Sequence, residues 1–211
     1  MWRKVTELQE ALEQISEIRL RMARGEVFTG YRAAPAAISG LLAIGAGILQ
    51  PLVAPSPLSQ PGPYLALWIG VALFSAVIGV LLLRLRPKRT DSTRLGRQTT
   101  WLAVEQFIPA MLAGGLLTLA LMRYAPESLW LLPGLWQVLF SLGLFASCRM
   151  LPRGLVAVAV WFLVSGFLCF RFAAGEHAFS PWAMALPFGA GQLMAAGVLY
   201  WSLERWDGRQ A

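Results

Sequence analysis

The chain has 211 residues, of which 57% are hydrophobic and only 14% are charged, and its formal net charge is +7. A soluble domain usually carries about 25% charged residues, and here the charges gather in Met1 to Arg32, in Arg84 to Arg97 and at the last few positions. The long apolar stretches between these clusters exclude a soluble globular domain and predict a polytopic membrane protein. No basic stripe is interleaved with aromatic residues, so the positive charge does not predict a nucleic-acid partner.

The segment before the first apolar stretch is predicted to be an amphipathic helix over residues 2–24. Its opposite face mixes acidic and basic side chains, which favours packing on protein over lying on lipid. The segment has no apolar region of the signal-peptide kind, so we expect residues 1–32 to form a cytoplasmic amphipathic helix and linker that stay in the mature protein. Apolar side chains recur along the helix with the heptad-like spacing of a short coiled coil, at Val5, Leu8, Leu12, Ile15 and Met22.

Six apolar stretches of about twenty residues follow, each long enough at 1.5 Å per residue to cross a hydrocarbon core of about 30 Å. The sequence therefore predicts an all-α polytopic membrane protein, with a six-helix transmembrane domain over residues 33–204 and a cytoplasmic tail over 205–211. The expected spans cover about 33–53, 64–83, 101–122, 128–148, 155–173 and 181–203.

The basic loop from Arg84 to Arg97 orients these spans. It holds six of the eighteen Lys and Arg residues, and cytoplasmic loops carry the excess of such residues. With this loop inside, both termini are cytoplasmic, and only Arg123 and Arg171 fall on the outer side. We also expect the loop to contact the anionic lipid headgroups of the bilayer.

Polar residues inside the spans are the first place to look for a function. Counting from the span ends places four of them near the bilayer midplane, on the second, fourth, fifth and sixth spans. One interpretation is a polar pocket or permeation path for a neutral or weakly polar solute. The other, which we favour, is interhelical hydrogen bonding, which contributes about 0.6 kcal/mol per bond in membrane bundles. The four residues are Ser75, Gln137, Ser165 and Gln192.

Glu105 is the one acidic residue inside a predicted span, about one turn from the inner end of the third. It is either a proton or cation site, or a carboxylate that reaches the interface or pairs with a basic residue there, such as Arg149. We favour the second interpretation, because a side chain this close to the span end has access to the headgroups.

Metal, cofactor and catalytic motifs are not predicted. His177 is the only histidine, and neither Cys148 nor Cys169 lies near it, whereas a zinc site needs three or four protein ligands. The two cysteines are expected near opposite faces of the membrane and are interpreted as small buried side chains. Convergent catalytic groups are not found, so an enzyme is the least supported interpretation.

Small residues recur four positions apart in several spans, a spacing typical of closely packed membrane helices. Prolines inside the spans are expected to kink them and expose backbone carbonyls. The small pairs are Ala36/Gly40, Ser75/Gly79, Ala110/Gly114 and Gly191/Ala195, and the prolines are Pro35, Pro109, Pro133 and Pro187.

Two groups of residues carry a resemblance. The first runs from Glu17-Ile18-Arg19 through Gly30-Tyr31-Arg32 to Ser39-Gly40, and the second comprises Pro133-Gly134 with Trp136 and Phe188-Gly189 with Gln192. In these positions the chain resembles bacterial six-span membrane proteins of unassigned function. The resemblance implies a location in the bacterial cytoplasmic (inner) membrane, and it brings no reaction, ligand or functional residue with it.

The leading functional hypothesis from the sequence is a non-enzymatic membrane anchor, accessory or sensory subunit. Its N-terminal helix would pair with a cytoplasmic protein partner or with another copy of the chain, because that heptad-like segment has no other evident role. The apolar stripe of this helix can also pack under its own bundle. The alternative function is a small transporter or channel for a neutral or weakly polar solute through the four midplane residues.

Overall fold

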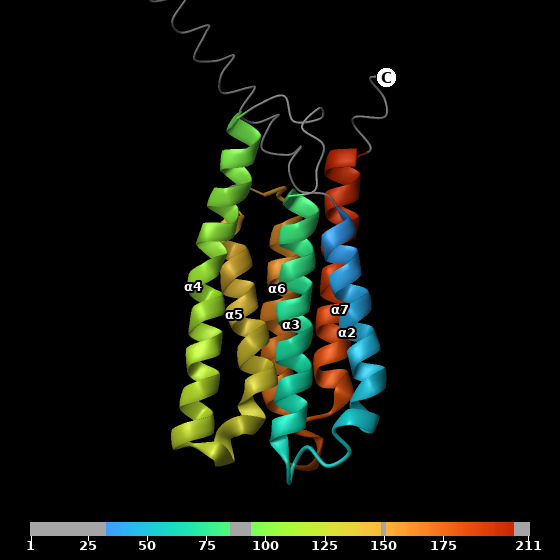
Figure 1. Cartoon of the computed structure of the whole chain (residues 1–211), viewed down its shortest axis with the longest axis vertical. Coiled ribbons are helices and arrows are strands. Elements are labelled where there is room, and N and C mark those ends of the chain that lie inside the picture. The colour runs from blue at the N-terminus through green and yellow to red at the C-terminus, as the bar shows by residue number, and fades with distance from the viewer. Residues whose placement is uncertain (1–32, 85–93, 149–150, 205–211) are drawn as a thin grey trace, which may run out of the picture.

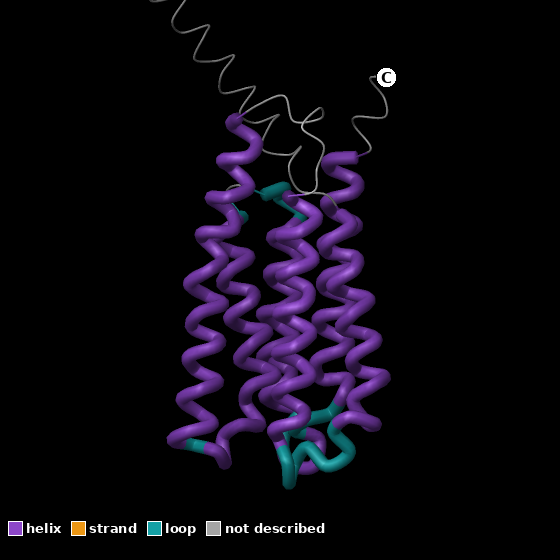
Figure 2. Tube along the Cα trace, in the orientation of Figure 1, coloured by secondary structure: helices purple, strands orange, loops and turns teal. Residues whose placement is uncertain are grey.

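The computed structural model describes residues 33–84, 94–148 and 151–204, and these residues form helices and short connections without any strand. The predicted N-terminal helix, with Val5 to Met22, lies outside them. The described helices run side by side in a single bundle (Figure 1, Figure 2). They are α2 (Ala33–Val53), α3 (Pro61–Arg84), α4 (Arg94–Tyr124), α5 (Leu132–Ser147), α6 (Leu155–Phe172) and α7 (Pro181–Leu199).

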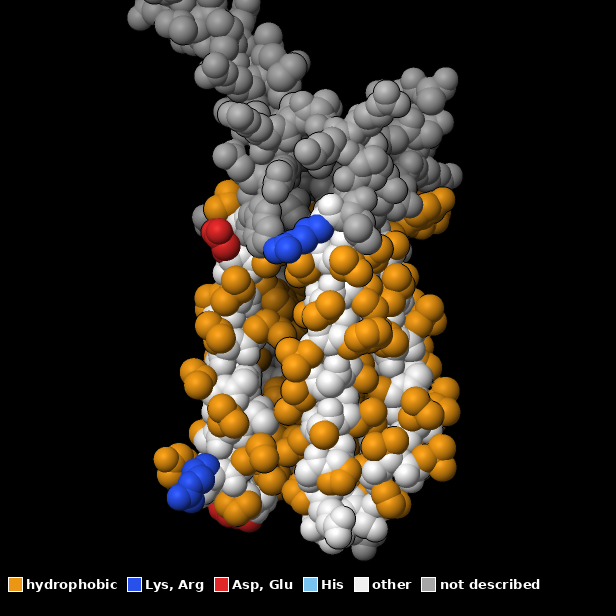
Figure 3. Space-filling view, viewed as in Figure 1, with side chains coloured by type: hydrophobic (Ala, Val, Ile, Leu, Met, Phe, Trp, Pro, Cys, Tyr) orange, Lys and Arg blue, Asp and Glu red, His pale blue; other side chains and the backbone are white. Residues whose placement is uncertain are grey.

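Within the described residues, six segments are long and apolar enough to cross a membrane, in agreement with the six predicted spans. The first and last residues of each segment lie within three residues of the predicted ones. On the face that Figure 3 shows, the Asp, Glu, Lys and Arg side chains lie toward the two ends, and hydrophobic side chains cover the band between them. The segments are Ala33–Val53, Pro61–Leu82, Val104–Tyr124, Pro126–Ser147, Leu155–Phe172 and Pro181–Ser202.

The connection between α3 and α4 is shorter than the predicted Arg84 to Arg97 loop. Helix α3 extends to Arg84, and α4 begins at Arg94 and runs for 31 residues, well beyond the apolar segment that starts at Val104. The first proline within α4 is Pro109, so nothing in the sequence stops this helix at the edge of its apolar stretch. The predicted loop was therefore wrong for residues 94–97, which belong to α4, whereas the predicted start of the membrane span lies within three residues of the observed one.

The two ends of the bundle differ in their connections (Figure 1). The lower end in that view holds the α2–α3 connection, the 3-10 helix η1 (Pro126–Leu131) before α5, and the short 3-10 helix η2 (Gly175–His177) before α7. Gly175 has a φ of 61°, a left-handed conformation that favours glycine, so it makes the turn out of α6. At the upper end α7 continues into a π-helical turn, η3 (Tyr200–Glu204).

Helix α7 packs most closely against α2, and α5 packs against α4 and α6, while α3 rests on α2. Small residues bring α2 and α7 together, since a Cβ added at Gly40 would lie 3.1 Å from the Gly189 carbonyl oxygen. Helices α3 and α4 are much less enclosed than the others. Only 11% and 6% of their apolar segments are buried within the chain, against 33–39% for the other four. These two helices therefore present most of their surface to the bilayer or to a partner.

Four phenylalanine rings meet near the middle of α5, α6 and α7. Phe140 contacts Phe107, Phe162 and Phe188 with ring centroids 5.0, 4.7 and 5.5 Å apart, and Phe162 and Phe188 are 5.1 Å apart. These are ordinary tilted or edge-to-face aromatic contacts. The rings come from α4, α5, α6 and α7 and join them at one level.

Candidate functional site

The four polar residues predicted at the midplane do not form one site. Ser75, Ser165 and Gln192 are half-buried, whereas Gln137 is fully buried, and among the described residues no hydrogen bond joins any two of the four. Gln137 lies level with the first turn of α7, because its Nε2 donates to the carbonyl oxygen of Ala183 at 2.9 Å. Gln192 follows nine residues after position 183, about 13 Å further along the axis of α7.

Several buried or half-buried hydroxyl groups in the bundle donate to backbone carbonyls. Ser165 Oγ donates to Phe162 of its own helix at 3.2 Å, and Ser141 Oγ donates across the interface from α5 to Ala159 of α6 at 2.7 Å. Ser141 is fully buried and was not among the predicted residues. Its position in the fourth predicted span, one turn after Gln137, was the available signal.

The hydrogen bond from Gln137 to α7 uses a backbone carbonyl that a proline leaves without its helical donor. Pro187 has no backbone N–H, so it cannot donate to the carbonyl four residues earlier, which is that of Ala183. Gln137 of the neighbouring helix supplies the missing donor. The prediction that a proline exposes a backbone carbonyl therefore applies at Pro187. The exposed carbonyl is that of Ala183, and Gln137, one of the predicted polar residues, donates a hydrogen bond to it.

A second buried glutamine joins α2, α3 and the start of α7. Gln50 is 1% exposed, its Nε2 donates to the Phe179 carbonyl at 2.7 Å, and its Oε1 accepts from Trp68 Nε1 at 3.0 Å. Sequence analysis did not select Gln50, which lies near the end of its span. Its direct neighbour Pro51 and its place in the apolar segment Ala33–Val53 were the available signals.

Two fully buried polar atoms at the same end have no hydrogen-bond partner, Tyr64 Oη and Gln137 Oε1. Cys169 of α6 is a free thiol that is 8% exposed. We refer to the five side chains here as the α7-start cluster. It comprises Gln50, Tyr64, Trp68, Gln137 and Cys169.

Glu105 lies on α4, one residue after the apolar segment begins at Val104, and its side chain is exposed. Its neighbour Gln106 is half-buried, with an Oε1 atom that has no partner. The suggested partner Arg149 lies outside the described residues. The position of Glu105 at the very start of the apolar segment is compatible with a carboxylate that reaches the membrane interface.

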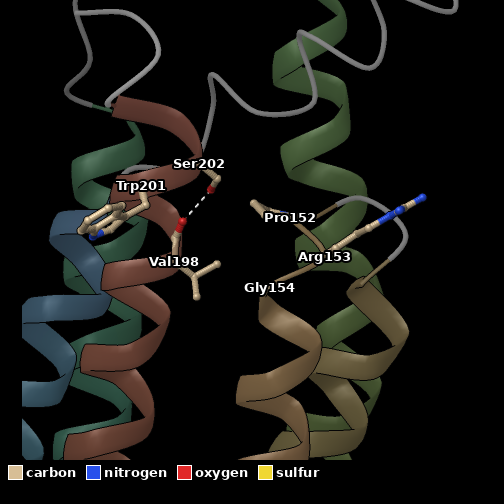
Figure 4. A pocket seen from close by; sticks show the side chains of 6 residues that line it. All are labelled: Pro152, Arg153, Gly154, Val198, Trp201 and Ser202. Atoms are coloured by element: carbon tan, nitrogen blue, oxygen red, sulfur yellow. Dashed lines mark hydrogen bonds between the residues drawn. The ribbon is translucent and has the colours of Figure 1, made fainter.

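One depression of about 460 Å³ lies at the upper end, between the start of α6 and the end of α7 (Figure 4). The Ser202 hydroxyl beside it donates to the Val198 carbonyl at 2.6 Å, and the Arg153 side chain points away from it. The part of its wall formed by described residues is therefore mainly apolar and directs no charged group into it. The residues around it are Pro152, Arg153, Gly154, Val198, Trp201 and Ser202.

The helices and their buried polar contacts define the class of the chain, a multi-pass helical membrane protein. Comparison with protein-family models, with curated proteins and with solved structures finds no match for this chain.

Proposed function

We propose that the chain is a membrane-embedded anchor, accessory or sensory subunit rather than a conduit. Its N-terminal helix, with Val5, Leu8, Leu12, Ile15 and Met22, binds a cytoplasmic protein partner or a second copy of the chain. The observation that supports this proposal is that contacting phenylalanine rings fill the space between α4, α5, α6 and α7.

The four contacting rings of Phe107, Phe140, Phe162 and Phe188 occupy the level at which a solute path would have to pass between α4, α5, α6 and α7. A solute there would have to separate ring pairs whose centroids are 4.7–5.5 Å apart. The buried polar groups nearby are used to join helices, as the Ser141 bond from α5 to α6 illustrates. A bundle held in this way suits a scaffold that carries a binding element.

The proposed location is the bacterial inner membrane with both termini in the cytoplasm. Helix α3 ends at Arg84, α4 begins at Arg94, and Arg153 precedes α6, all at the upper end of the bundle. Arg123 and Arg171 lie at the lower end, each over the ring of the next residue in the chain. The upper end therefore carries the larger share of basic residues, which supports a cytoplasmic position for it and contact with anionic headgroups.

Deletion of residues 2–24 is expected to abolish association with the partner or with the second copy, because the apolar stripe that makes the contact is removed. Crosslinking in native membranes, followed by mild solubilisation and mass spectrometry, measures this. Leu8→Gln combined with Leu12→Gln should have the same effect, and Glu10→Gln on the polar face should leave crosslinking unchanged. Equal crosslinking by the full chain and the deleted chain would contradict the proposal.

A second candidate function, a small transporter or channel for a neutral or weakly polar solute, is favoured by the unpartnered Gln137 Oε1 and Ser75 Oγ atoms. On this hypothesis Gln137→Leu and Gln192→Leu reduce solute flux into vesicles, normalised to the amount of folded protein, because they remove the polar contacts along the path. Ser141→Ala is the matched control, because its hydroxyl already has a partner. Unchanged flux of every solute tested would remove the support for this candidate.

A further inference from the structure

We propose that the depression at the upper end of the bundle (Figure 4) is the docking site of the chain's own N-terminal helix, predicted over residues 2–24. The apolar stripe of that helix fills the depression when no partner is bound. Docking itself does not depend on the proposed function, but its consequence rests on it. A docked stripe is withheld from the cytoplasmic partner or the second copy, which must displace it to bind.

The upper ends of the helices lie at different heights, and this difference makes room for a docked helix. In Figure 1, α4 and the continuous α7–η3 helix rise above the upper ends of α5 and α6. Helix α4 begins ten residues before the apolar segment that starts at Val104, and η3 extends to Glu204. The depression of about 460 Å³ lies in the range of about 300–1,000 Å³ typical of ligand clefts. It therefore has room for more than one apolar side chain.

The wall of the depression suits an apolar stripe. Pro152 and Val198 point into the gap from its two sides (Figure 4). The gap closes below them, because a Cβ added at Gly154 would lie 2.8 Å from Val198 Cγ1. Val198 in turn packs against a cluster that includes the buried Leu155 and Leu199. Apolar surface of this kind contributes roughly 25 cal/mol per Å² when leucine or isoleucine side chains cover it.

The path of the chain brings the predicted helix to this end of the bundle. Helix α2 begins at Ala33, and Ala33 packs against the same apolar cluster as Val198, which lines the depression. Residues 25–32 connect the predicted helix to Ala33, and eight residues span at most about 29 Å. A segment tethered this closely has an effective concentration on the order of millimolar. Even a weak contact is therefore sufficient for docking within one chain.

Charge favours the bundle over the lipid surface as the site for this helix. Residues 7–17 contain three residues of the apolar stripe, four glutamates and no Lys or Arg. Anionic headgroups repel such an acidic segment. The upper end of the described bundle carries basic residues, at Arg84, Arg94 and Arg153. Because Arg153 is exposed and points away from the depression (Figure 4), it leaves the apolar gap open and adds positive charge beside it.

Photo-crosslinking in the purified full-length protein tests the docking site. The photoreactive amino acid p-benzoylphenylalanine replaces Ser202, which is exposed and lies beside the depression. Irradiation is expected to join position 202 to residues 5–22 of the same chain, in a product with the mass of a single chain. The control probe replaces Leu73, which is 61% exposed in the middle of α3. It should not form this product.

Leu8→Gln combined with Leu12→Gln should lower the yield of the Ser202 product several-fold, because amides replace side chains that enter the depression. Gln14→Ala, outside the stripe, is the matched control and should leave the yield unchanged. An equal yield from the double variant would overturn the proposal, as would crosslinks confined to lipid, to residues 85–93 or to another copy. No partner is added, so a failure of docking is distinct from a failure of association in native membranes.

Discussion

Gly166→Ala should lower the free energy of unfolding by about 2–3 kcal/mol, as overpacking of a close contact typically does. Gly166 of α6 faces Gly134 of α5, and a Cβ added at Gly166 would lie 2.9 Å from the Gly134 carbonyl oxygen and 3.2 Å from the Val138 backbone nitrogen. These neighbours are backbone atoms, which cannot rotate away as a side chain can. The two helices must therefore separate to admit one methyl group.

Gly115→Ala on α4 is the matched control, because nothing lies within 4 Å of a Cβ added there. It should leave stability unchanged or raise it by up to about 1 kcal/mol, because alanine is the better helix former and nothing opposes its methyl group. Both variants are compared with the wild type by unfolding in mixed micelles at increasing SDS fraction. If Gly166→Ala is as stable as Gly115→Ala, the close approach of α5 and α6 is refuted.

The number and the limits of the spans could be predicted from the sequence because they depend on a one-dimensional property. A stretch such as Leu155–Phe172 is apolar apart from Ser165 and, near its end, Arg171, so its length and hydropathy identify it. The start of α4 at Arg94 could not be predicted in this way. Outside the hydrocarbon a helix is free to continue into polar residues, and hydropathy carries no information about where it stops.

Helix contacts were only partly predictable from small residues. Gly40 and Gly191 of the predicted pairs do lie in tight contacts, but nothing lies within 4 Å of a Cβ added at Gly79. The tight contact between Gly134 and Gly166 belongs to none of the predicted pairs. A spacing of four residues identifies one face of a helix, and it does not identify the helix that covers that face.

The candidate site was predictable in its residue types and not in its arrangement. Gln137 was selected as a polar residue inside a span and Pro187 as a source of a free carbonyl, but nothing in the sequence joins the two. Their partnership depends on the packing of α5 beside α7 at a particular depth, which is a tertiary property. Tyr64 and Cys169 gave still less signal, because both residue types are common in membrane helices as anchors or small apolar side chains.

Gln137→Leu should lower the free energy of unfolding by about 1–2 kcal/mol, because it leaves the Ala183 carbonyl buried without a donor. The wild-type bond is 2.9 Å long and replaces the helical bond that Pro187 cannot make. In a Pro187→Ala background the alanine N–H can donate to Ala183, so the Gln137→Leu substitution should then be close to neutral. The effect of Gln137→Leu on the free energy of unfolding is compared in the wild-type and Pro187→Ala backgrounds, and the difference between the two values gives the contribution of the Gln137 hydrogen bond.

The matched control for this cycle is a Pro109→Ala background, in which the proline removed lies inside α4 and not in α7. Gln137→Leu should be as destabilising there as in the wild type, because the carbonyl of Ala183 still lacks its backbone donor. Unfolding of all the variants is measured under the same micelle conditions. An equal effect of Gln137→Leu in the Pro187→Ala and Pro109→Ala backgrounds would mean that the amide does not substitute for the missing N–H. The destabilisation would then arise from the packing of the leucine side chain, and the link between proline position and buried glutamine would have no energetic basis.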